Sequence, residues 1–240
     1  MSSETKRLDS IASDSLYTTI SNIMTIEYSF KIFERFLRPG SILELGPAEG
    51  IMTEHLYKLN RELTLVDGSE IFCNELKQKF PGTKVIESLF EDFKTDEVYE
   101  NIIMGHVLEH VEDPVAILAG VRDILSDDGY ILSAVPNSRS LHRQAAVVMG
   151  LIPAEDTMSE LDHHHGHRRI YSPELFRQDF IKAGYEIVHY GGYWLKPLSN
   201  SQIHQYWSKE LLYSFMQLGE RYPDIAGEIY VIAKKGKKWN

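Results

Sequence analysis

The sequence predicts an α/β protein built on one doubly wound, mostly parallel sheet. Short apolar strands alternate with amphipathic helices along the chain, a pattern typical of βαβ units. The 240 residues are 43% hydrophobic, with 35 acidic and 25 basic side chains and one cysteine. A chain of this length buries a sizeable core without metals, and a single cysteine cannot form an internal disulfide.

The residue patterning predicts seven strands and six helices. The predicted strands are 41–45, 63–66, 83–86, 101–104, 130–135, 185–190 and 228–233. The predicted helices are 11–37, 52–59, 71–80, 114–125, 173–183 and 202–219. Apolar residues three to five positions apart indicate the helices, and Pro-Gly, Asp-Gly and Pro-Asn pairs end several elements. Sheets of this kind bind ligands outside the carboxyl ends of their strands.

The turn after the first strand is the most informative feature. Gly46, Ala48 and Gly50 place small residues at alternate positions, where a backbone can pass close to a ligand. This spacing differs from the G-x-G-x-x-G fingerprint of dinucleotide-binding turns. The carboxylate of Glu44 would repel a pyrophosphate and suits a cation. Asp67 ends the second strand, where a carboxylate can accept both hydroxyls of a ribose.

These residues resemble the motifs of class I S-adenosylmethionine-dependent methyltransferases. The stretch 44–50 is similar to the family's E-x-G-x-G-x-G motif, with Ala48 at the middle glycine, and Asp67 is similar to its ribose-binding acid. The string GHVLEHVEDP at 105–114 closely matches the stretch after the family's fourth strand and is the most specific signal. The resemblance covers residues 40–136 and implies a Rossmann-like fold with S-adenosylmethionine as cofactor.

The resemblance also implies a cofactor site and an organisation of the chain. The implied cofactor-binding residues are Glu44, Gly46, Pro47, Ala48, Gly50, Asp67, Gly68, Ser88, Leu89, Phe90, Gly105, His106 and Val107. We expect one domain over 1–240. It divides into a helical lid (1–38), a cofactor-binding core (40–136), a substrate-covering insertion (137–172) and C-terminal helices and strands (173–235). The apolar stripe of the first helix suits core packing as well as a lid.

A later segment, GHRRIYSPEL at 166–175, is similar to a stretch of ubiquinone-biosynthesis O-methyltransferases and their small-molecule relatives. The resemblance implies methyl transfer to a small molecule. His167 and His110 are the candidate catalytic residues, with His167 preferred, because a hydroxyl acceptor benefits from a base with a pKa near neutrality. An amine that arrives deprotonated, or a carboxylate, needs no base. We expect O-methylation and leave N-methylation of a small amine or amino sugar open.

The insertion also contains candidate contacts to an anionic acceptor. Arg139, Arg143, Arg168 and Arg169 are suited to bind carboxylate or phosphate, although each also suits a solvated surface. Tyr17 of the N-terminal helix is a further candidate substrate contact. The acceptors that we expect are a nucleotide-linked sugar, a phosphorylated metabolite or a carboxylate, in specialised-metabolite or surface-polysaccharide biosynthesis.

The run DHHHGH at 162–167 suggests a metal site, because imidazole and carboxylate suit transition metals. Consecutive histidines do not all face one ion, however, and only His163 and His167 have the i, i+4 spacing of one helix face. Mg²⁺ prefers oxygen ligands. We therefore expect no metal and a polar loop that faces the substrate.

Other classes of function are weighed against this interpretation. The turn spacing and Glu44 argue against a nicotinamide-dependent oxidoreductase, whereas a non-catalytic S-adenosylmethionine-binding protein would keep every motif. The formal net charge of −10 disfavours nucleic acid as a partner. Because residues 139–169 carry four arginines and four acids, that charge does not exclude a small anionic acceptor.

The chain shows no sign of export or of a membrane partner. No apolar run approaches the ~18 residues of a membrane span, and the first residues lack the apolar core of a signal peptide. The lone Cys73 favours a reducing compartment. We expect a cytoplasmic protein whose partner is a small molecule, and a homodimer is compatible with these features.

Overall fold

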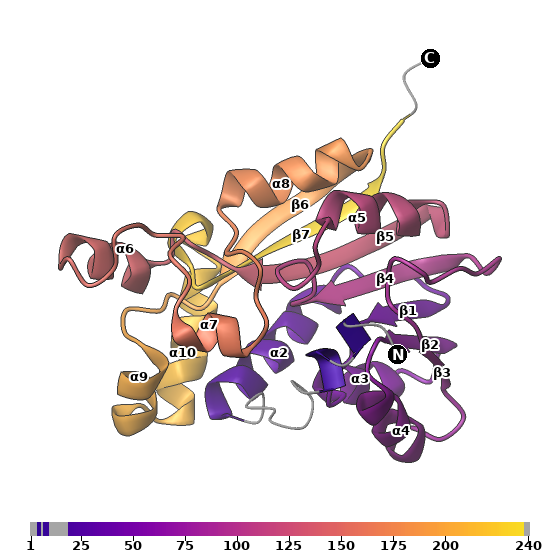
Figure 1. The fold of residues 1–240 in the computed structure, drawn as a ribbon, viewed down its shortest axis with the longest axis horizontal. Helices are drawn as coiled ribbons and strands as arrows, with labels where there is room; N and C mark the ends of the chain where they lie inside the picture. The colour runs from indigo at the N-terminus through magenta and orange to yellow at the C-terminus, as the bar shows by residue number, and fades with distance from the viewer. Residues whose placement is uncertain (1–3, 6, 10–18, 238–240) are drawn as a thin grey trace.

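The computed structural model describes residues 4–5, 7–9 and 19–237. These contain one seven-stranded sheet in the order β3-β2-β1-β4-β5-β7-β6 (Figure 1). The strands are β1 (Ile42–Leu45), β2 (Leu63–Asp67), β3 (Lys84–Glu87), β4 (Tyr99–Gly105), β5 (Leu125–Pro136), β6 (Tyr185–Tyr193) and β7 (Glu228–Lys235). β7 runs antiparallel to β5 and β6, and the other pairs are parallel. The predicted fold, a mostly parallel Rossmann-like sheet, is confirmed.

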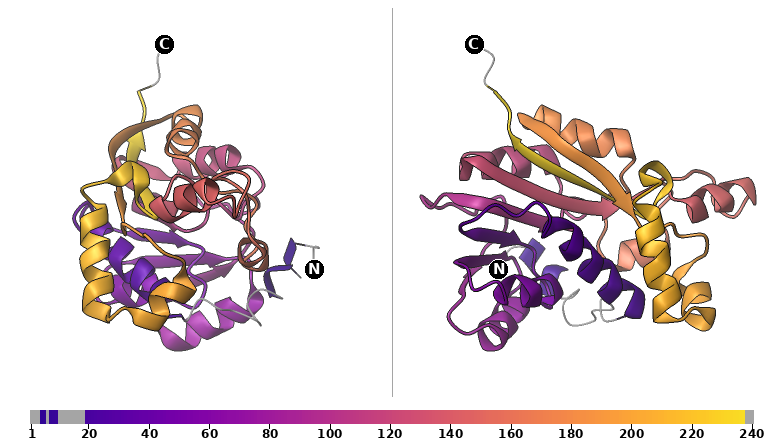
Figure 2. Two further views of the ribbon diagram at one scale, coloured as in Figure 1. Left: turned by 90° about the vertical axis from the view of Figure 1, so that its left-hand side faces the viewer. Right: turned by 180° about the vertical axis from the view of Figure 1, so that it is seen from behind.

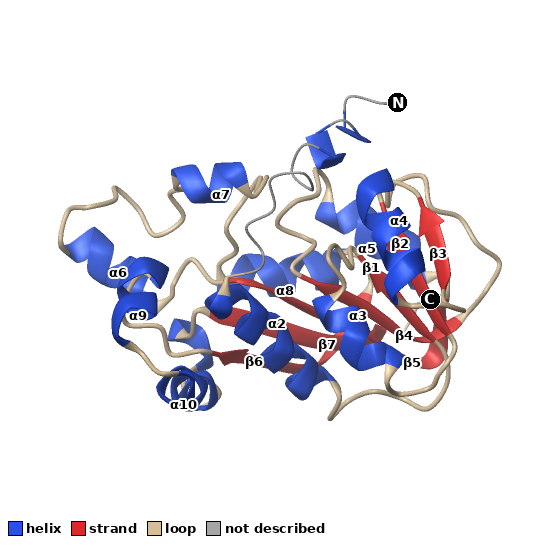
Figure 3. Cartoon of the chain, turned by 90° about the horizontal axis from the view of Figure 1, so that it is seen from below, coloured by secondary structure: helices blue, strands red, loops and turns tan. Residues whose placement is uncertain are grey.

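Helices cover both faces of the sheet. They are α2 (Ile20–Phe33), α3 (Ile51–Tyr57), α4 (Glu70–Lys79), α5 (Pro114–Arg122), α6 (Leu141–Val148), α7 (Glu160–His164), α8 (Pro173–Lys182), α9 (Asn200–Tyr206) and α10 (Lys209–Gly219), with a short 3₁₀ turn at Pro223–Ile225. α2 and α3 lie on one face, and α5 and α8 lie on the other (Figures 1 and 3). None of the described helices is long and apolar enough to cross a membrane.

The alternation of side chains along β1 shows how the sheet divides the core. Leu43 and Leu45 point to the hydrophobic cluster beneath α5 and α8, and Ile42 points to the cluster beneath α2, α3 and α4. All three side chains are at most 1% exposed. A strand that is buried on both faces is typical of the centre of a parallel sheet. Ligands of such sheets bind outside the carboxyl ends of the central strands, so the end of β1 at Leu45 is a candidate binding position.

The helices expected at 114–125 and 202–219 differ from those observed. The helix expected at 114–125 ends at Arg122, and β5 begins at Leu125, because Leu125 pairs with Tyr99 of β4. The helix expected at 202–219 is two helices, α9 and α10. Trp207 is extended between them, and the hydroxyl of Ser208 accepts the N–H of Leu211 as the N-cap of α10.

The N-terminal helix and the insertion also differ from expectation. The helix expected at 11–37 falls partly outside the described residues, and its described part, α2, ends at Phe33 and packs into the core. In the insertion, α7 ends at His164, so His163 and His167 do not share a helix face. α6 projects from the body of the molecule (Figure 2) and buries no residue.

Candidate active site

Two cavities with a common wall lie at the carboxyl ends of the central strands. The first has a volume of about 430 Å³, and the second about 170 Å³. Ile26, His106, His110 and His165 line both. β1 has β2 on one side and β4 on the other, so the first cavity occupies the point where strand order reverses, the usual ligand site of such sheets.

The turn after β1 forms the floor of the first cavity. Gly46 has a φ of 70°, and a Cβ there would lie 2.8 Å from Cγ2 of Val107 in the loop after β4. Only glycine allows the two loops to approach so closely. Gly50 has a φ of 83° and precedes α3 without lining the cavity. The predicted residues Gly46, Pro47 and Ala48 do line it.

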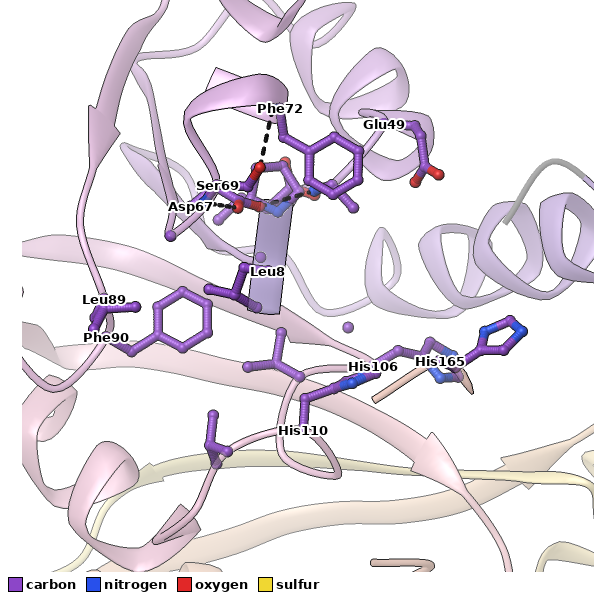
Figure 4. A pocket seen from close by; sticks show the side chains of 18 of the residues that line it. Leu8, Glu49, Asp67, Ser69, Phe72, Leu89, Phe90, His106, His110 and His165 are labelled. Atoms are coloured by element: carbon purple, nitrogen blue, oxygen red, sulfur yellow. Dashed lines mark hydrogen bonds between the residues drawn. The ribbon is translucent and has the colours of Figure 1, made fainter. Parts of the chain in front are cut away.

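Asp67 is held at one end of this cavity by the backbone around it (Figure 4). Its Oδ1 accepts the N–H of Ser69 at 2.9 Å, and its Oδ2 accepts the N–H of Ala48 at 3.2 Å. Burial raises the pKa of Asp67 to about 6. The carboxylate is therefore oriented by two donors and keeps lone pairs for ribose hydroxyls.

An apolar wall continues from Asp67 toward the loop after β4. Leu8, Phe72, Leu89 and Phe90 supply it (Figure 4). Such a wall can hold a flat aromatic base. Ser88, which we expected in the cofactor site, does not line the cavity, and its hydroxyl donates to the carbonyl of Leu89.

Glu44 borders the first cavity as a nearly buried acid. It is 3% exposed, and its Oε2 accepts the hydroxyl of Thr53 at 2.7 Å. Burial raises its pKa to about 8. At neutral pH the folded, cofactor-free chain therefore holds Glu44 mainly protonated.

We predict that Glu44→Gln reduces the loss of stability that occurs as pH rises from about 4.5 to about 8. The folded pKa of Glu44, about 8, exceeds the ordinary 4.5, so the folded state binds the proton more tightly and stability falls as pH rises between these values. Glutamine keeps the bond from Thr53 and cannot ionise. The variant should exceed the parent in unfolding free energy at pH 9 by roughly 2–4 kcal/mol, measured by urea denaturation without cofactor. Equal pH slopes for the two proteins would contradict this.

Backbone strain is concentrated at the cavities. Ala48, Asn60, His106 and Trp194 are the described non-glycine residues with positive φ. Ala48 and His106 line the first cavity, and Trp194 lines the second. Such conformations persist where the surrounding structure imposes them, commonly at functional sites.

Ala48→Gly should stabilise the cofactor-free chain. Ala48 has a φ of 48°, a left-handed conformation that costs an L-residue ~1–2 kcal/mol and glycine almost nothing. The greater entropy of glycine in the unfolded chain offsets part of this gain. We expect the unfolding free energy to rise by about 0.5–1 kcal/mol in urea denaturation. A lower unfolding free energy would show that the turn does not strain Ala48.

The loop after β4 brings three ionisable side chains to the shared wall. His106 Nδ1 lies 3.4 Å from Oε1 of Glu109, which is 1% exposed. Burial opposes the ionisation of Glu109, but His106 and the neighbouring histidines hold its pKa below the ordinary value. Burial lowers the pKa of His110 to about 4, so His110 is neutral at physiological pH.

His167 reaches the same place from the segment after α7. Its ring centroid lies 4.8 Å from that of His110 in an edge-to-face arrangement, and its Nδ1 lies 3.4 Å from Oδ1 of Asp162. Both rings line the second cavity. The two predicted catalytic histidines are thus brought together beside the wall that both cavities share.

Two of the predicted substrate-binding arginines line neither cavity. Arg139 forms an exposed ion pair with Glu174 at 2.7 Å. Arg169 donates to the backbone carbonyls of Leu108, Val111 and Glu112 and thereby anchors the loop after β4. The guanidinium group of Arg139 thus lies at the surface, and that of Arg169 stabilises a loop of the backbone.

The other predicted substrate contacts have mixed positions. Arg143 lines the second cavity but donates to the carbonyls of Glu155 and Thr157. Arg168 lines the first and pairs with Glu4 at 3.0 Å. Tyr17 lies outside the described residues.

Sequence patterning missed several residues of the second cavity. They are His142, Trp194, Lys196, Asn200 and Glu228. Burial lowers the pKa of Lys196 to about 8, and its ammonium lies 4.7 Å from the ring centroid of Trp194. Burial raises the pKa of Glu228. These residues follow the cofactor-binding core, in a part of the chain that carries no motif pointing to them.

A family model described as a methyltransferase domain matches residues 23–190. The chain belongs to this methyltransferase family. The resemblance to class I S-adenosylmethionine-dependent methyltransferases is confirmed, and S-adenosylmethionine is the cofactor. The first cavity fits it, because Asp67 can bind the ribose, the apolar wall can hold the adenine, and the turn at Gly46 leaves room for a ligand beside the backbone.

This methyltransferase is similar to the ubiquinone biosynthesis O-methyltransferase of Dinoroseobacter shibae, with 25% identity over 176 residues. The match covers 70% of this chain and 66% of that protein, slightly less than two thirds of its length. In fold it is similar to the CcbJ methyltransferase from Streptomyces caelestis (TM-score 0.67, 14% identity, 98% of this chain and 100% of that one). It is also similar to the glycopeptide N-methyltransferase MtfA (TM-score 0.59, 12% identity, 88% and 90%).

Proposed function

We propose that the chain transfers the methyl group of S-adenosylmethionine to a hydroxyl oxygen of a small molecule bound in the second cavity. The observation that supports this proposal is the wall that the two cavities share. A cofactor in the first cavity can present its methyl group only toward a neighbouring space, and the second cavity adjoins the first at His106 and His110. The similarity to an O-methyltransferase of ubiquinone biosynthesis supports oxygen as the acceptor atom.

The transfer itself is an in-line displacement that depends mainly on alignment. The acceptor oxygen attacks the methyl carbon, the carbon–sulfur bond breaks, and its electron pair stays on sulfur to give S-adenosylhomocysteine. The hydroxyl proton must leave. His167 is suited to accept it, because Asp162 lies 3.4 Å from Nδ1 and would stabilise the imidazolium. His110 is suited to position the acceptor as a neutral ring.

An anionic group on the acceptor suits the part of the second cavity that Lys196 lines. The ammonium of Lys196 lies over the ring of Trp194 and donates no hydrogen bond to another described residue, whereas the guanidinium of Arg143 donates to backbone carbonyls. We propose a metabolite that carries a carboxylate or phosphate which binds Lys196. A volume of about 170 Å³ suits a small metabolite better than a whole nucleotide-linked sugar.

N-methylation is the second candidate, and the buried acids of the cavity favour it. Glu109 and Glu228 both line the second cavity and would attract an ammonium group. The fold is also that of MtfA, a glycopeptide N-methyltransferase.

A search for the acceptor tests the proposal. The purified chain is incubated with S-adenosylmethionine and fractionated metabolite extracts, and release of S-adenosylhomocysteine is measured. We expect one or a few fractions to stimulate release, with the strongest response to anionic hydroxyl compounds and a reduced response in Lys196→Met. No stimulation by any fraction, with cofactor binding intact, would instead favour a non-catalytic S-adenosylmethionine-binding protein.

A further inference from the structure

Three metal-binding side chains converge beside the second cavity. Glu109 and His110 follow β4, and His167 follows α7. One potential ligand atom from each lies within 4.8 Å of the other two. Two imidazoles and one carboxylate match the ligand sets of catalytic zinc sites and of several transition-metal enzymes.

The buried carboxylate of Glu109 lacks a hydrogen-bond partner in the described part of the chain and would be stabilised by a bound cation. Glu109 is 1% exposed, and neither of its oxygens has a hydrogen-bond partner among the described residues. Its contact with His106 Nδ1, at 3.4 Å, is longer than a normal hydrogen bond. Buried carboxylates are ordinarily paired closely or bound to a metal, because an isolated buried charge is costly.

The two histidines have the supporting contacts of metal ligands. Asp162 Oδ1 lies 3.4 Å from His167 Nδ1, close enough for an electrostatic contact but longer than a normal hydrogen bond, and this contact leaves Nε2 of His167 available. The ring of His110 faces the carbonyl of Gly166 as a hydrogen-bond partner. Metal-bound histidines usually direct their second nitrogen to a carboxylate or a backbone carbonyl, which fixes the tautomer and the ring orientation.

We propose that Glu109, His110 and His167 bind one divalent transition metal ion of the zinc type. The expectation of a metal-free site rested on the histidine run 162–167 alone. The proposed ligands instead come from two separate loops, and only His167 belongs to that run. Three protein ligands leave at least one position open on the ion.

The open position has a chemical use that rests on the proposed function. An acceptor hydroxyl bound there would have a lowered pKa. Its proton would pass to solvent, the oxygen would attack the methyl carbon, and the electrons of the broken carbon–sulfur bond would remain on sulfur. In the metal-loaded protein His167 would hold the ion in place of accepting the proton.

Metal binding is tested on the full chain without an affinity tag, after treatment with a chelator and dialysis. Co²⁺ is titrated and followed by its visible absorption, and Zn²⁺ is then added as a competitor. We expect one Co²⁺ per chain, displaced by Zn²⁺. His167→Ala and Glu109→Gln should bind more than about 100-fold more weakly, and Asp162→Asn about 10- to 100-fold more weakly.

His164→Ala is the matched control, because His164 lies in the same histidine run but outside the cluster. It should bind Co²⁺ like the parent chain. Each variant is also titrated with S-adenosylhomocysteine, whose unchanged affinity shows an intact fold. Equal losses in His164→Ala and His167→Ala would assign the ion to the histidine run and overturn the inference, as would the absence of Co²⁺ binding.

The two proposals fail separately. Methyl transfer that persists in the chelator-treated chain, which then binds no Co²⁺, would overturn the metal site and leave the proposed function standing. Co²⁺ binding at the cluster without methyl transfer to any acceptor would support the metal site and overturn the proposed function.

Discussion

Asp67→Asn should lower the affinity for S-adenosylmethionine about 100-fold. The carboxylate of Asp67 is oriented by the N–H groups of Ser69 and Ala48 and can accept both ribose hydroxyls. Hydrogen bonds to a charged acceptor contribute about 1.5–3 kcal/mol each, and about 1.4 kcal/mol corresponds to a tenfold change in affinity. Asparagine keeps one acceptor oxygen but loses the charge and the second acceptor. Calorimetric titration with S-adenosylhomocysteine measures the effect.

Glu70→Gln is the control for this substitution. Glu70 is exposed in the first turn of α4, three residues from Asp67, and does not line the cavity. The substitution Glu70→Gln removes one negative charge, as Asp67→Asn does, and should leave the affinity for S-adenosylhomocysteine unchanged. An affinity of Asp67→Asn within threefold of the parent, with Glu70→Gln also unchanged, would show that the ribose is not held at Asp67.

His167→Ala should lower kcat by about 100- to 10,000-fold, the range for loss of a positioned proton-transfer group. The affinity for S-adenosylmethionine should stay unchanged, because His167 lines the second cavity and not the first. The measurement is steady-state release of S-adenosylhomocysteine with the acceptor found in the extract search. The loss is expected whether His167 accepts the proton or holds a metal ion.

His164→Ala serves again as the control and should retain full kcat, since His164 is exposed on α7. A kcat for His167→Ala close to that of His164→Ala would show that His167 takes no part in the reaction. The assignment of the acceptor side to the second cavity would then lose its main chemical support.

The mostly parallel sheet and the first cavity could be predicted because their signals are local. Parallel strands buried on both faces give apolar runs that are visible in sequence, and the close approach at Gly46 needs glycine whatever lies elsewhere. Boundaries were less accurate. Leu125 lies in β5 because it pairs with Tyr99, a partner distant in sequence.

The second cavity could be predicted only in part. His110 and His167 were found through their motifs, whereas Lys196 and Glu228 reach the cavity from β6, β7 and their connections through tertiary packing. Arg139 and Arg169 line neither cavity, and for Arg169 the reason is physical. A guanidinium suits an anionic substrate, but it also satisfies several backbone carbonyls at once, as Arg169 does in the loop after β4.

The most direct measurement uses S-adenosylmethionine labelled with carbon-13 in its methyl group. The chain is incubated with the labelled cofactor and the active metabolite fraction, and the product is examined by nuclear magnetic resonance, with Asp67→Asn as the matched control. The proposed function predicts a labelled methyl carbon with the chemical shift of an O-methyl group, much reduced in the control. A label with the shift of an N-methyl group, or no label above the control, would contradict it.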